Sequence, residues 1–296
     1  MEEIDVSIII VNYNTKTLTK NCIDSIVSQT HGVSYEIILV DNASSDGSVE
    51  VFENDNRINF IKSDKNLGFG KANNLGYRYS QGKYVFLLNS DTLLLNNSIK
   101  LFFDKMENVD EYVGCMGCLL QDTEGNRVHS YSDFPKVGNL LSYMVWSGFK
   151  YIVQGKMNMD DPKRMDINPS FFPVDFITGA DLFIRRTTIE ECGLFDPDFF
   201  MYFEDPEMEW RYAQKGYKRY IYDAPQIVHL EGKSFEKTNS KLLVKLQSNI
   251  LYYDKTGQRW KLLLLRMLIM LKYPYLIRKY NMDNVEKKLF WNIVKI

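Results

Sequence analysis

The sequence predicts an α/β protein built on a doubly wound parallel sheet. Three short apolar runs, Val6–Val11, Glu36–Val40 and Tyr84–Leu88, have the length and the β-branched or aromatic content of buried strands. Helical patterns lie between them, and such alternation is typical of doubly wound sheets. Each run ends in polar or acidic residues. Because ligands of open α/β sheets bind beyond the carboxyl ends of the strands, we expect the active site there.

Composition sets the broad class of the protein. The chain has 296 residues, 45% hydrophobic and 25% charged, so it can bury a large core, and we expect one large domain with an appendage. Its net charge of -2 conceals a split: residues 255–296 carry ten basic and two acidic side chains, and the rest carries 26 basic and 36 acidic ones. This split argues against a nucleic-acid binder and predicts a tail that meets an anionic partner.

The cysteines and the N-terminus indicate the compartment. Four cysteines follow no disulfide framework, and the first residues lack the basic and apolar segments of a signal peptide. We therefore expect a reducing, cytoplasmic protein. Cys115 and Cys118 lie within an apolar run, and no second pair exists to complete a zinc site, so we interpret them as strand interior.

The rest of the first 90 residues alternates in the same way. The expected elements, in order, are a helix with Leu18, Cys22, Ile23, Ile26 and Val27 on one face, a short helix after Asp46-Gly47, a weak strand at Asn59–Lys62, and a helix ending near Tyr79 that follows Asn66–Gly70.

The turn after the first strand contains no glycine, whereas dinucleotide-binding folds need Gly-x-Gly-x-x-Gly there. No Walker A sequence is present either. If this half binds a nucleoside diphosphate, a divalent metal held by Asp91, just after the third apolar run, is the simplest source of positive charge. Asp41, at the end of the second run, is placed to accept hydrogen bonds from a pyrimidine base or a ribose. Tyr13 is placed to stack on the base.

The organisation changes beyond residue 95. We expect a helix from Asn97 to Met106 and a strand from Val113 to Leu120, followed by an irregular region, residues 121–173, with a helix near 137–150. A strand-like run, Val174–Ile184, is then broken by Gly179 and Ala180. Small residues there would let a substrate approach the backbone.

A second acidic centre follows a cluster of large apolar residues. Glu204, Asp205 and Pro206 predict the start of a helix, and acidic residues are common in a first turn because the helix dipole stabilises them. A carboxylate in apolar surroundings opposite Asp91 would instead be a general base, and two acidic centres from distant parts of the chain favour that role. A strand from Lys218 to Leu230 carries His229 near its end, where the imidazole is placed to join Asp91 on a metal.

The C-terminal segment is basic and apolar. Trp260–Lys272 is interrupted by Arg266 and is too short and too charged to span a bilayer. Its aromatic and basic residues are typical of an interfacial helix on anionic lipid. A dimerisation helix is the alternative.

Several motifs in one order identify a family resemblance. They are Val6–Asn14, Asp41-Asn42 with Asp46 and Gly47, Asn66 with Gly68, Asn89–Thr92, Asp175 with Gly179-Ala180 and Arg185-Arg186, Phe200–Asp205, and His229 with Gly232 and Ser234. Together they resemble the family 2 inverting glycosyltransferases with a GT-A fold, and most of all their bacterial rhamnosyltransferase branch. The resemblance covers about residues 5–235.

The resemblance implies a mostly parallel sheet flanked by helices, with a C-terminal helical extension. Residues 1–95 would form the nucleotide-sugar half, residues 96–235 the acceptor half, and residues 236–296 a basic amphipathic helical tail.

It also implies roles for single residues. The nucleotide-sugar side would use Tyr13, Asp41, Asn66, Gly68, Ser90 and Asp91. The metal ligands would be Asp91 and His229, with Asn89 in place of the first acid of the family's Asp-x-Asp motif. Asp205 would be the catalytic base, and the acceptor or supporting positions would be Gly179, Ala180, Glu204, Trp210 and Arg211. Asp181 departs from the small or apolar residue usual after Gly-Ala.

The implied activity is transfer of a sugar, with inversion, to a hydroxyl that Asp205 deprotonates, with Mg²⁺ or Mn²⁺ as cofactor. The donor would be a dTDP-sugar, dTDP-L-rhamnose by resemblance alone, or a UDP-sugar. The acceptor would be a polyprenyl-diphosphate-linked glycan of bacterial cell-surface polysaccharide synthesis, at the inner face of the plasma membrane. A nucleotidyltransferase and a catalytically silent sugar-nucleotide-binding subunit are the alternatives. The missing glycine-rich basic loop argues against the first, and the presence of Asp91 and Asp205 argues against the second.

Overall fold

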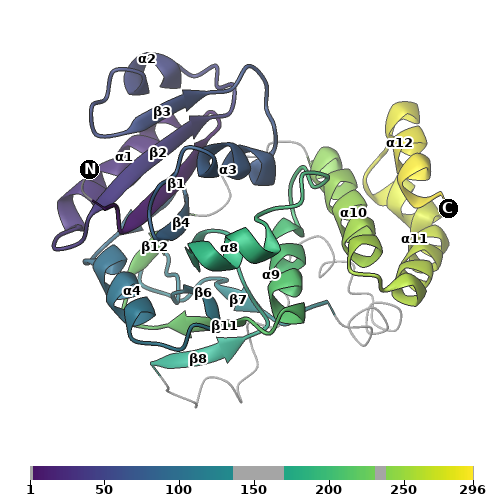
Figure 1. Cartoon of the computed structure of the whole chain (residues 1–296). Helices are drawn as coiled ribbons and strands as arrows, with labels where there is room; N and C mark the ends of the chain where they lie inside the picture. The colour runs from purple at the N-terminus through teal and green to yellow at the C-terminus, as the bar shows by residue number, and fades with distance from the viewer. Residues whose placement is uncertain (1–2, 136–169, 231–237, 296) are drawn as a thin grey trace.

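A mixed sheet flanked by helices forms the centre of the protein (Figure 1). The computed structural model describes residues 3–135, 170–230 and 238–295. Within them the large sheet has eight strands, in the spatial order β3 (Asn59–Lys62), β2 (Tyr35–Asp41), β1 (Val6–Asn12), β4 (Tyr84–Asn89), β10 (Asp181–Arg185), β6 (Val113–Gly117), β11 (Lys218–Tyr222) and β8 (Phe171–Val174). Strands β3, β2, β1 and β4 are parallel, β10 runs antiparallel to β4 and β6, and β8 runs antiparallel to β11. The predicted doubly wound, mostly parallel sheet is confirmed.

The strand order reverses between β1 and β4. The chain moves outward from β1 to β3 and then returns to place β4 on the other side of β1. In the register of the sheet, Asn12 pairs with Asp41 and Val11 with Asn89. The polar ends of three strands therefore lie side by side at the point where open sheets bind their ligands.

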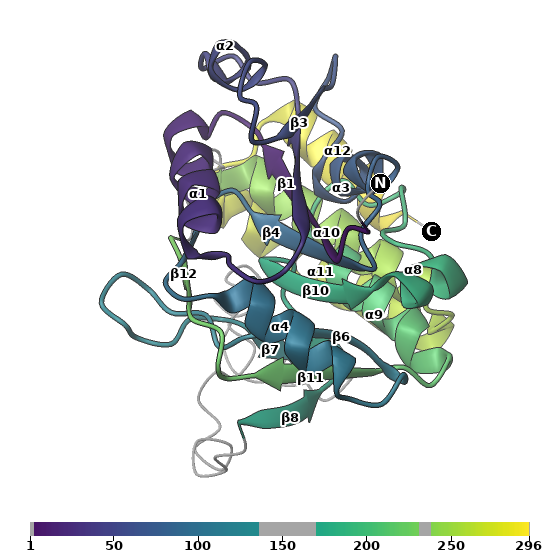
Figure 2. The same ribbon diagram turned by 60° about the vertical axis from the view of Figure 1, so that its left-hand side comes forward.

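Helices cover both faces of the sheet (Figure 2). The first face packs against α1 (Lys16–Gln29), α2 (Ser48–Phe52) and α4 (Ser98–Glu107), and the second against α3 (Phe69–Tyr77), α8 (Arg186–Cys192) and α9 (Glu204–Gln214). Ile8 and Ile10 of β1 belong to the first core and Ile9 to the second, as the alternation of side chains along a strand requires.

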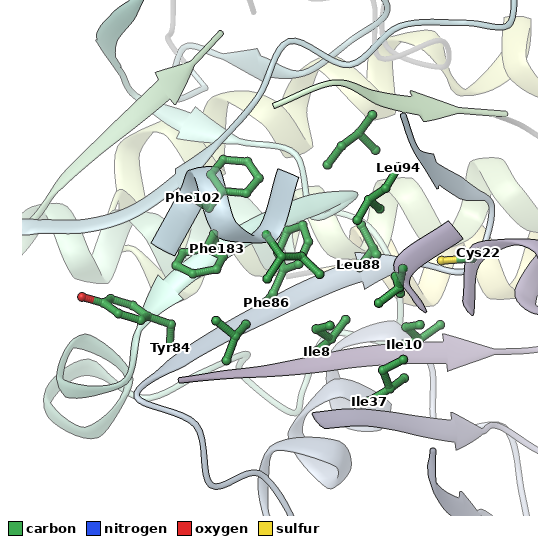
Figure 3. Packing of buried hydrophobic residues seen from close by; sticks show 14 of the residues in the cluster. Ile8, Ile10, Cys22, Ile37, Tyr84, Phe86, Leu88, Leu94, Phe102 and Phe183 are labelled. Atoms are coloured by element: carbon green, nitrogen blue, oxygen red, sulfur yellow. The ribbon is translucent and has the colours of Figure 1, made fainter. Parts of the chain in front are cut away.

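Aromatic rings join the two halves of the sheet (Figure 3). The rings of Phe102 and Phe183 stack at 5.3 Å, and Phe183 lies 5.2 Å from Tyr84 and 5.7 Å from Phe86. The Tyr84 hydroxyl donates to Glu107 at 2.6 Å. Because these residues come from β4, β10 and α4, the cluster fixes the strand that ends at the predicted site.

Three predicted strands are wrong in their extent. The run from Lys218 to Leu230 is two strands, β11 and β12 (Ile227–His229), because the side chain of Asn96 binds Ala224 O and Gln226 N and turns the chain between them. β12 pairs with β5 (Thr92–Leu94), which places His229 opposite Thr92.

The second and third runs are also shorter than predicted. The run from Val113 ends at Gly117, because the next backbone N–H donates to the side chain of Asp181. Val174–Ile184 contains the end of β8, then β9 (Phe176–Ile177), which pairs with β7 (Tyr131–Ser132), and part of β10. The helix expected near residues 137–150 lies outside the described residues.

The C-terminal helices form a separate group beside α9 (Figure 1). They are α10 (Thr238–Lys255), α11 (Arg259–Lys279) and α12 (Asn284–Val294), and they share one buried core with Phe199. Lys255 forms ion pairs with Asp196 and Asp198, and Ser248 donates to Met201 O at 2.8 Å. The group is therefore attached to the segment that leads into α9. Among the described helices none is long and apolar enough to cross a bilayer.

Candidate active site

A buried polar network closes the carboxyl ends of β1 and β2. Asn12 Nδ2 donates to Asp41 Oδ1 at 2.7 Å, and Asn12 Oδ1 accepts from Thr15 and Thr19. The second oxygen of Asp41 accepts the backbone N–H of Ser44 at 3.0 Å. Asp41 is fully buried, so it orients the loop around it, and its contact with a base stays a prediction. Tyr13, next to Asn12, is 39% exposed and available for stacking.

The predicted nucleoside loop is held by Asn42. Its amide donates to Asn66 Oδ1 at 3.0 Å and accepts the N–H of Leu67 at 2.8 Å. Gly68 has φ of +82°, and a Cβ there would lie 2.1 Å from Phe200 O. The loop therefore packs directly against the segment that precedes Asp205, and only glycine fits at this contact.

The end of β4 forms a candidate metal centre with β12. His229 Nε2 lies 3.3 Å from Asp91 Oδ1 and 3.3 Å from Asn89 Nδ2, and Ser90 Oγ lies 3.1 Å from Thr15 Oγ1. A cation with bonds of about 2.1 Å fits the carboxylate oxygen and the imidazole nitrogen at this separation. The described residues contain no cluster of three or more His, Cys, Asp or Glu for a metal. Phosphate oxygens and water would complete such a site, as is usual for Mg²⁺.

Gly179 and Ala180 join the two acidic centres. Asn89 N–H donates to Ala180 O at 2.9 Å, and Gly179 N–H donates to Asp205 Oδ2 at 3.1 Å. A Cβ on Gly179 would lie 2.5 Å from Asp205 Oδ1. Asp205 thus contacts the backbone next to the cluster of Asn89 and Asp91. Its carboxylate lies where a side chain on residue 179 would be, and it fits there because residue 179 is glycine.

Asp205 and Glu204 begin α9 in apolar surroundings. Burial raises the pKa of both carboxyls, and that of Glu204 rises further because the charge on Asp205 opposes it. The backbone bond from Gly179 acts in the opposite direction on Asp205. Asp205 Oδ1 is buried and has no hydrogen-bond partner among the described residues. An unsatisfied buried carboxylate oxygen is suited to accept a proton or a hydroxyl hydrogen bond.

The chain enters α9 with a strained backbone. Tyr202 and Phe203 have φ of +70° and +65°. Such conformations cost on the order of 1–3 kcal/mol each in non-glycine residues and occur mainly at functional sites. The strain is consistent with a fixed placement of the two acids that follow.

Arg211 and Trp210 hold α9 in place through contacts toward its C-terminal end. Arg211 forms an ion pair with Glu207 at 2.9 Å and donates to the carbonyls of Cys192 and Leu194. Trp210 packs edge-on against Phe134, with ring centroids 5.2 Å apart. These contacts fix the helix that carries Asp205, and the role of both residues in supporting the site stays a prediction.

Asp181 is fully buried, and its Oδ2 accepts the N–H of Cys118 at 2.6 Å. Burial raises its pKa to about 7. The side chain therefore lies inside the fold, where it ties the start of β10 to the end of β6.

Sequence reasoning gave no role to Asn12, Asn42 or the carbonyl of Phe200. The two asparagines lie at the ends of the first two predicted strands, so a signal for their roles was available. The Phe200 carbonyl had none, because its partner comes from a distant loop.

Solved structures identify the fold as GT-A. This chain is similar over 99% of its length to 55% of GalNAc-T7, which was solved with UDP, GalNAc and Mn²⁺. The TM-score is 0.60 and the sequence identity is 15%. This chain is also similar, over the same share of its length, to 86% of the mannosyltransferase PcManGT from Pyrobaculum calidifontis, solved with GDP-Man and Mn²⁺, with a TM-score of 0.57 and 14% identity. The second is a mannosyltransferase by name.

The sequence model for glycosyl transferase family 2 matches residues 7–177. The chain therefore belongs to this family.

Relatives with known names are similar over part of their length. The hexosyltransferase Agl10 of low-salt glycan biosynthesis in Haloferax volcanii is 28% identical over 70% of this chain and 61% of its own length. The N-acetylglucosaminyl-diphospho-decaprenol L-rhamnosyltransferase of Mycobacterium tuberculosis is 25% identical over 67% of each chain. The glycosyltransferase GlyG of Streptococcus pneumoniae is 29% identical over 36% of each chain. This chain thus spans about a third of GlyG and less than two thirds of Agl10.

Proposed function

We propose that this chain is an inverting glycosyltransferase that moves a sugar from a nucleotide sugar to a hydroxyl of a glycan acceptor. The observation that carries the proposal is the buried Oδ1 of Asp205, which has no hydrogen-bond partner in the described parts of the chain. Gly179 and Ala180 link Asp205 to the cluster of Asn89, Asp91 and His229. A single displacement needs a base that accepts the proton of the attacking hydroxyl. It also needs, close to that base, a centre that binds the departing anion.

In the proposed mechanism Asp205 accepts the proton of the attacking hydroxyl. The Gly179 N–H and the N-terminus of α9 stabilise its carboxylate before the reaction. A Mg²⁺ or Mn²⁺ ion held by Asp91 and His229 would supply positive charge to the departing diphosphate. Tyr13 and the Asn66–Gly68 loop would orient the nucleoside, so that the hydroxyl attacks the anomeric carbon opposite the leaving group.

We propose dTDP-L-rhamnose as the donor and a polyprenyl-diphosphate-linked glycan as the acceptor, with a UDP-sugar as the alternative donor. The name of the Mycobacterium tuberculosis relative supports L-rhamnose as the sugar and a polyprenyl-diphosphate-linked acceptor, whereas dTDP as the nucleotide rests on the family resemblance. A catalytically silent sugar-nucleotide-binding subunit is the second candidate, and it would have no use for a strained backbone and a buried base at Asp205.

Metal-dependent donor binding tests the pocket. We expect one class among UDP-, GDP- and dTDP-sugars to raise the melting temperature with Mn²⁺ or Mg²⁺ and not with EDTA. Asp91→Ala should lose this shift, because the cation would lose its carboxylate ligand, a charge worth several kcal/mol in such sites. Asp104→Ala, an exposed acid on α4, is the control and should keep it. Stabilisation that EDTA or Asp91→Ala leaves unchanged would contradict the proposed metal centre.

We also propose that α11 places the enzyme on the inner face of the plasma membrane. One face of this helix, with Leu262, Leu265 and Ile269, is buried against its neighbours. The opposite face exposes apolar side chains at helical spacing, namely Trp260, Leu263, Met267, Met270, Leu271 and Tyr275. Basic residues flank this stripe at Arg259, Lys261, Arg266, Lys272, Arg278 and Lys279.

An apolar stripe with basic flanks is complementary to anionic lipid, and it would bring the site to a lipid-linked acceptor. We expect Leu263→Asp with Leu271→Asp to weaken binding to vesicles of anionic lipid by about tenfold or more in co-sedimentation. Val51→Asp, on the exposed surface of α2, should bind as the wild type does. If the double variant still binds vesicles and instead turns a dimer into a monomer, the stripe is a dimer interface.

A further inference from the structure

Glu209 is a buried acid on α9 that the proposed mechanism does not use. Its side chain is fully buried. Both carboxylate oxygens accept the backbone N–H of Ile177, at 3.0 and 3.1 Å, and Cys115 Sγ lies 3.9 Å from one of them. A buried carboxyl is costly unless it is hydrogen-bonded, so its presence here calls for a reason beyond packing.

Glu209 and Asp205 bind the same segment. They are four residues apart on α9 and therefore lie on one face, one turn apart. The N–H groups they accept belong to Ile177 and Gly179, two residues apart, while the N–H of Thr178 between them points to Ser130 O at 3.0 Å. Two carboxyls one turn apart on this helix thus accept two alternate N–H groups of one extended segment.

We propose that Glu209 is a positioning residue for the base: it fixes Ile177–Gly179 on α9, so that the Gly179 N–H stays directed at Asp205. The inference rests on the proposed role of Asp205. It also explains why the segment needs an anchor. Gly179 has no side chain that could hold the segment in place. The hydrogen bond from the Ile177 N–H to Glu209, two residues earlier on the same side of the segment, supplies the anchor.

The charged and titratable groups around Glu209 are Arg219 on β11, Cys115 on β6, and Asp205 and Tyr212 on α9. Burial raises the pKa of Glu209 well above its ordinary value, and the charge on Asp205 adds to this. Glutamine, a neutral residue of the same shape with a carbonyl oxygen for the Ile177 N–H, should replace Glu209 with little change.

The test is the pH dependence of kcat/KM, measured as release of nucleoside diphosphate, for Glu209→Ala and Glu209→Gln. We expect Glu209→Ala to lower kcat about tenfold to a hundredfold with an unchanged donor KM, as for a displaced catalytic group. The acid limb of the pH profile of Glu209→Ala, where activity falls as the pH is lowered, should move to higher pH. The reason is that Asp205 loses the hydrogen bond from the Gly179 N–H, which lowers the pKa of the Asp205 carboxyl. Glu209→Gln should keep the wild-type limb.

Glu36→Ala is the matched control. It removes a carboxylate near the start of β2 that accepts the backbone N–H of Gln81 at 2.8 Å, so it should lower the melting temperature and leave the acid limb in place. If Glu209→Ala does not fold, Glu209→Asp, whose carboxyl is one methylene too short for Ile177, must show the same shift. An unmoved limb in these variants, or a Glu209→Gln enzyme as impaired as Glu209→Ala, would overturn the inference. Wild-type turnover in Asp205→Asn would instead overturn the proposed function itself.

Discussion

Asp205→Asn is expected to lower kcat by about 10²–10⁴-fold, because the amide cannot accept the proton of the attacking hydroxyl. The side chain keeps its shape and can still accept the Gly179 N–H, so the fold should be retained. Donor binding, followed as the metal-dependent rise in melting temperature, should stay within a few-fold of wild type. The contrast between lost turnover and retained binding distinguishes an enzyme from a silent binding subunit.

The Asp205 carboxyl should also determine the acid limb of the pH profile of the wild-type enzyme. A base works only when ionised, and burial raises the pKa of Asp205 above its ordinary value. Activity should therefore be lost at a pH above the range in which an exposed aspartate titrates. Asp205→Asn with near-normal turnover, or an acid limb near pH 4 in the wild type, would remove Asp205 from the proposed role.

Gly179→Ala is expected to have the second largest effect. The new methyl group would lie 2.5 Å from Asp205 Oδ1 and 3.1 Å from Phe69 Cε1, so the carboxylate must move. Displacing a catalytic group by about 1 Å can cost on the order of 100-fold in rate. The added atom should also destabilise the fold by about 1–3 kcal/mol, as overpacking usually does.

Gly76→Ala separates the two effects. A Cβ at this position in α3 would lie 2.6 Å from Ile9 Cγ2, a comparable clash that involves no acidic residue. We expect Gly76→Ala to lower the melting temperature and to leave kcat per folded molecule unchanged. Equal kcat values for the two variants would mean that Gly179 matters for packing alone.

The central part of the fold could be predicted because its signals are local. Val6–Val11 is a mostly β-branched run and Tyr84–Leu88 is a continuous apolar run, and both are strands in the structure. The position of Asn89 and Asp91 followed from the general rule that ligands bind at the carboxyl ends of such strands. These predictions needed no knowledge of distant contacts.

Predictions that depended on distant contacts were wrong or missing. The break between β11 and β12 is made by Asn96, whose partner Ala224 is 128 residues away, and nothing in the run itself reports it. Likewise, Glu209 looks like any acid in a helix, because neither its burial nor its bond to Ile177 is encoded in the local pattern. The acidic pair at the start of α9 was visible in the sequence, whereas its anchor was not.

The most direct test of the central claim is the anomeric configuration of the first sugar that the wild-type enzyme releases from its donor. Without an acceptor, water can take the place of the hydroxyl, and proton NMR early in the reaction resolves the two anomers before they equilibrate. A single displacement assisted by Asp205 predicts nucleoside diphosphate and a sugar of inverted configuration, and neither should form with Asp205→Asn. A retained configuration, or release of pyrophosphate, would contradict the account.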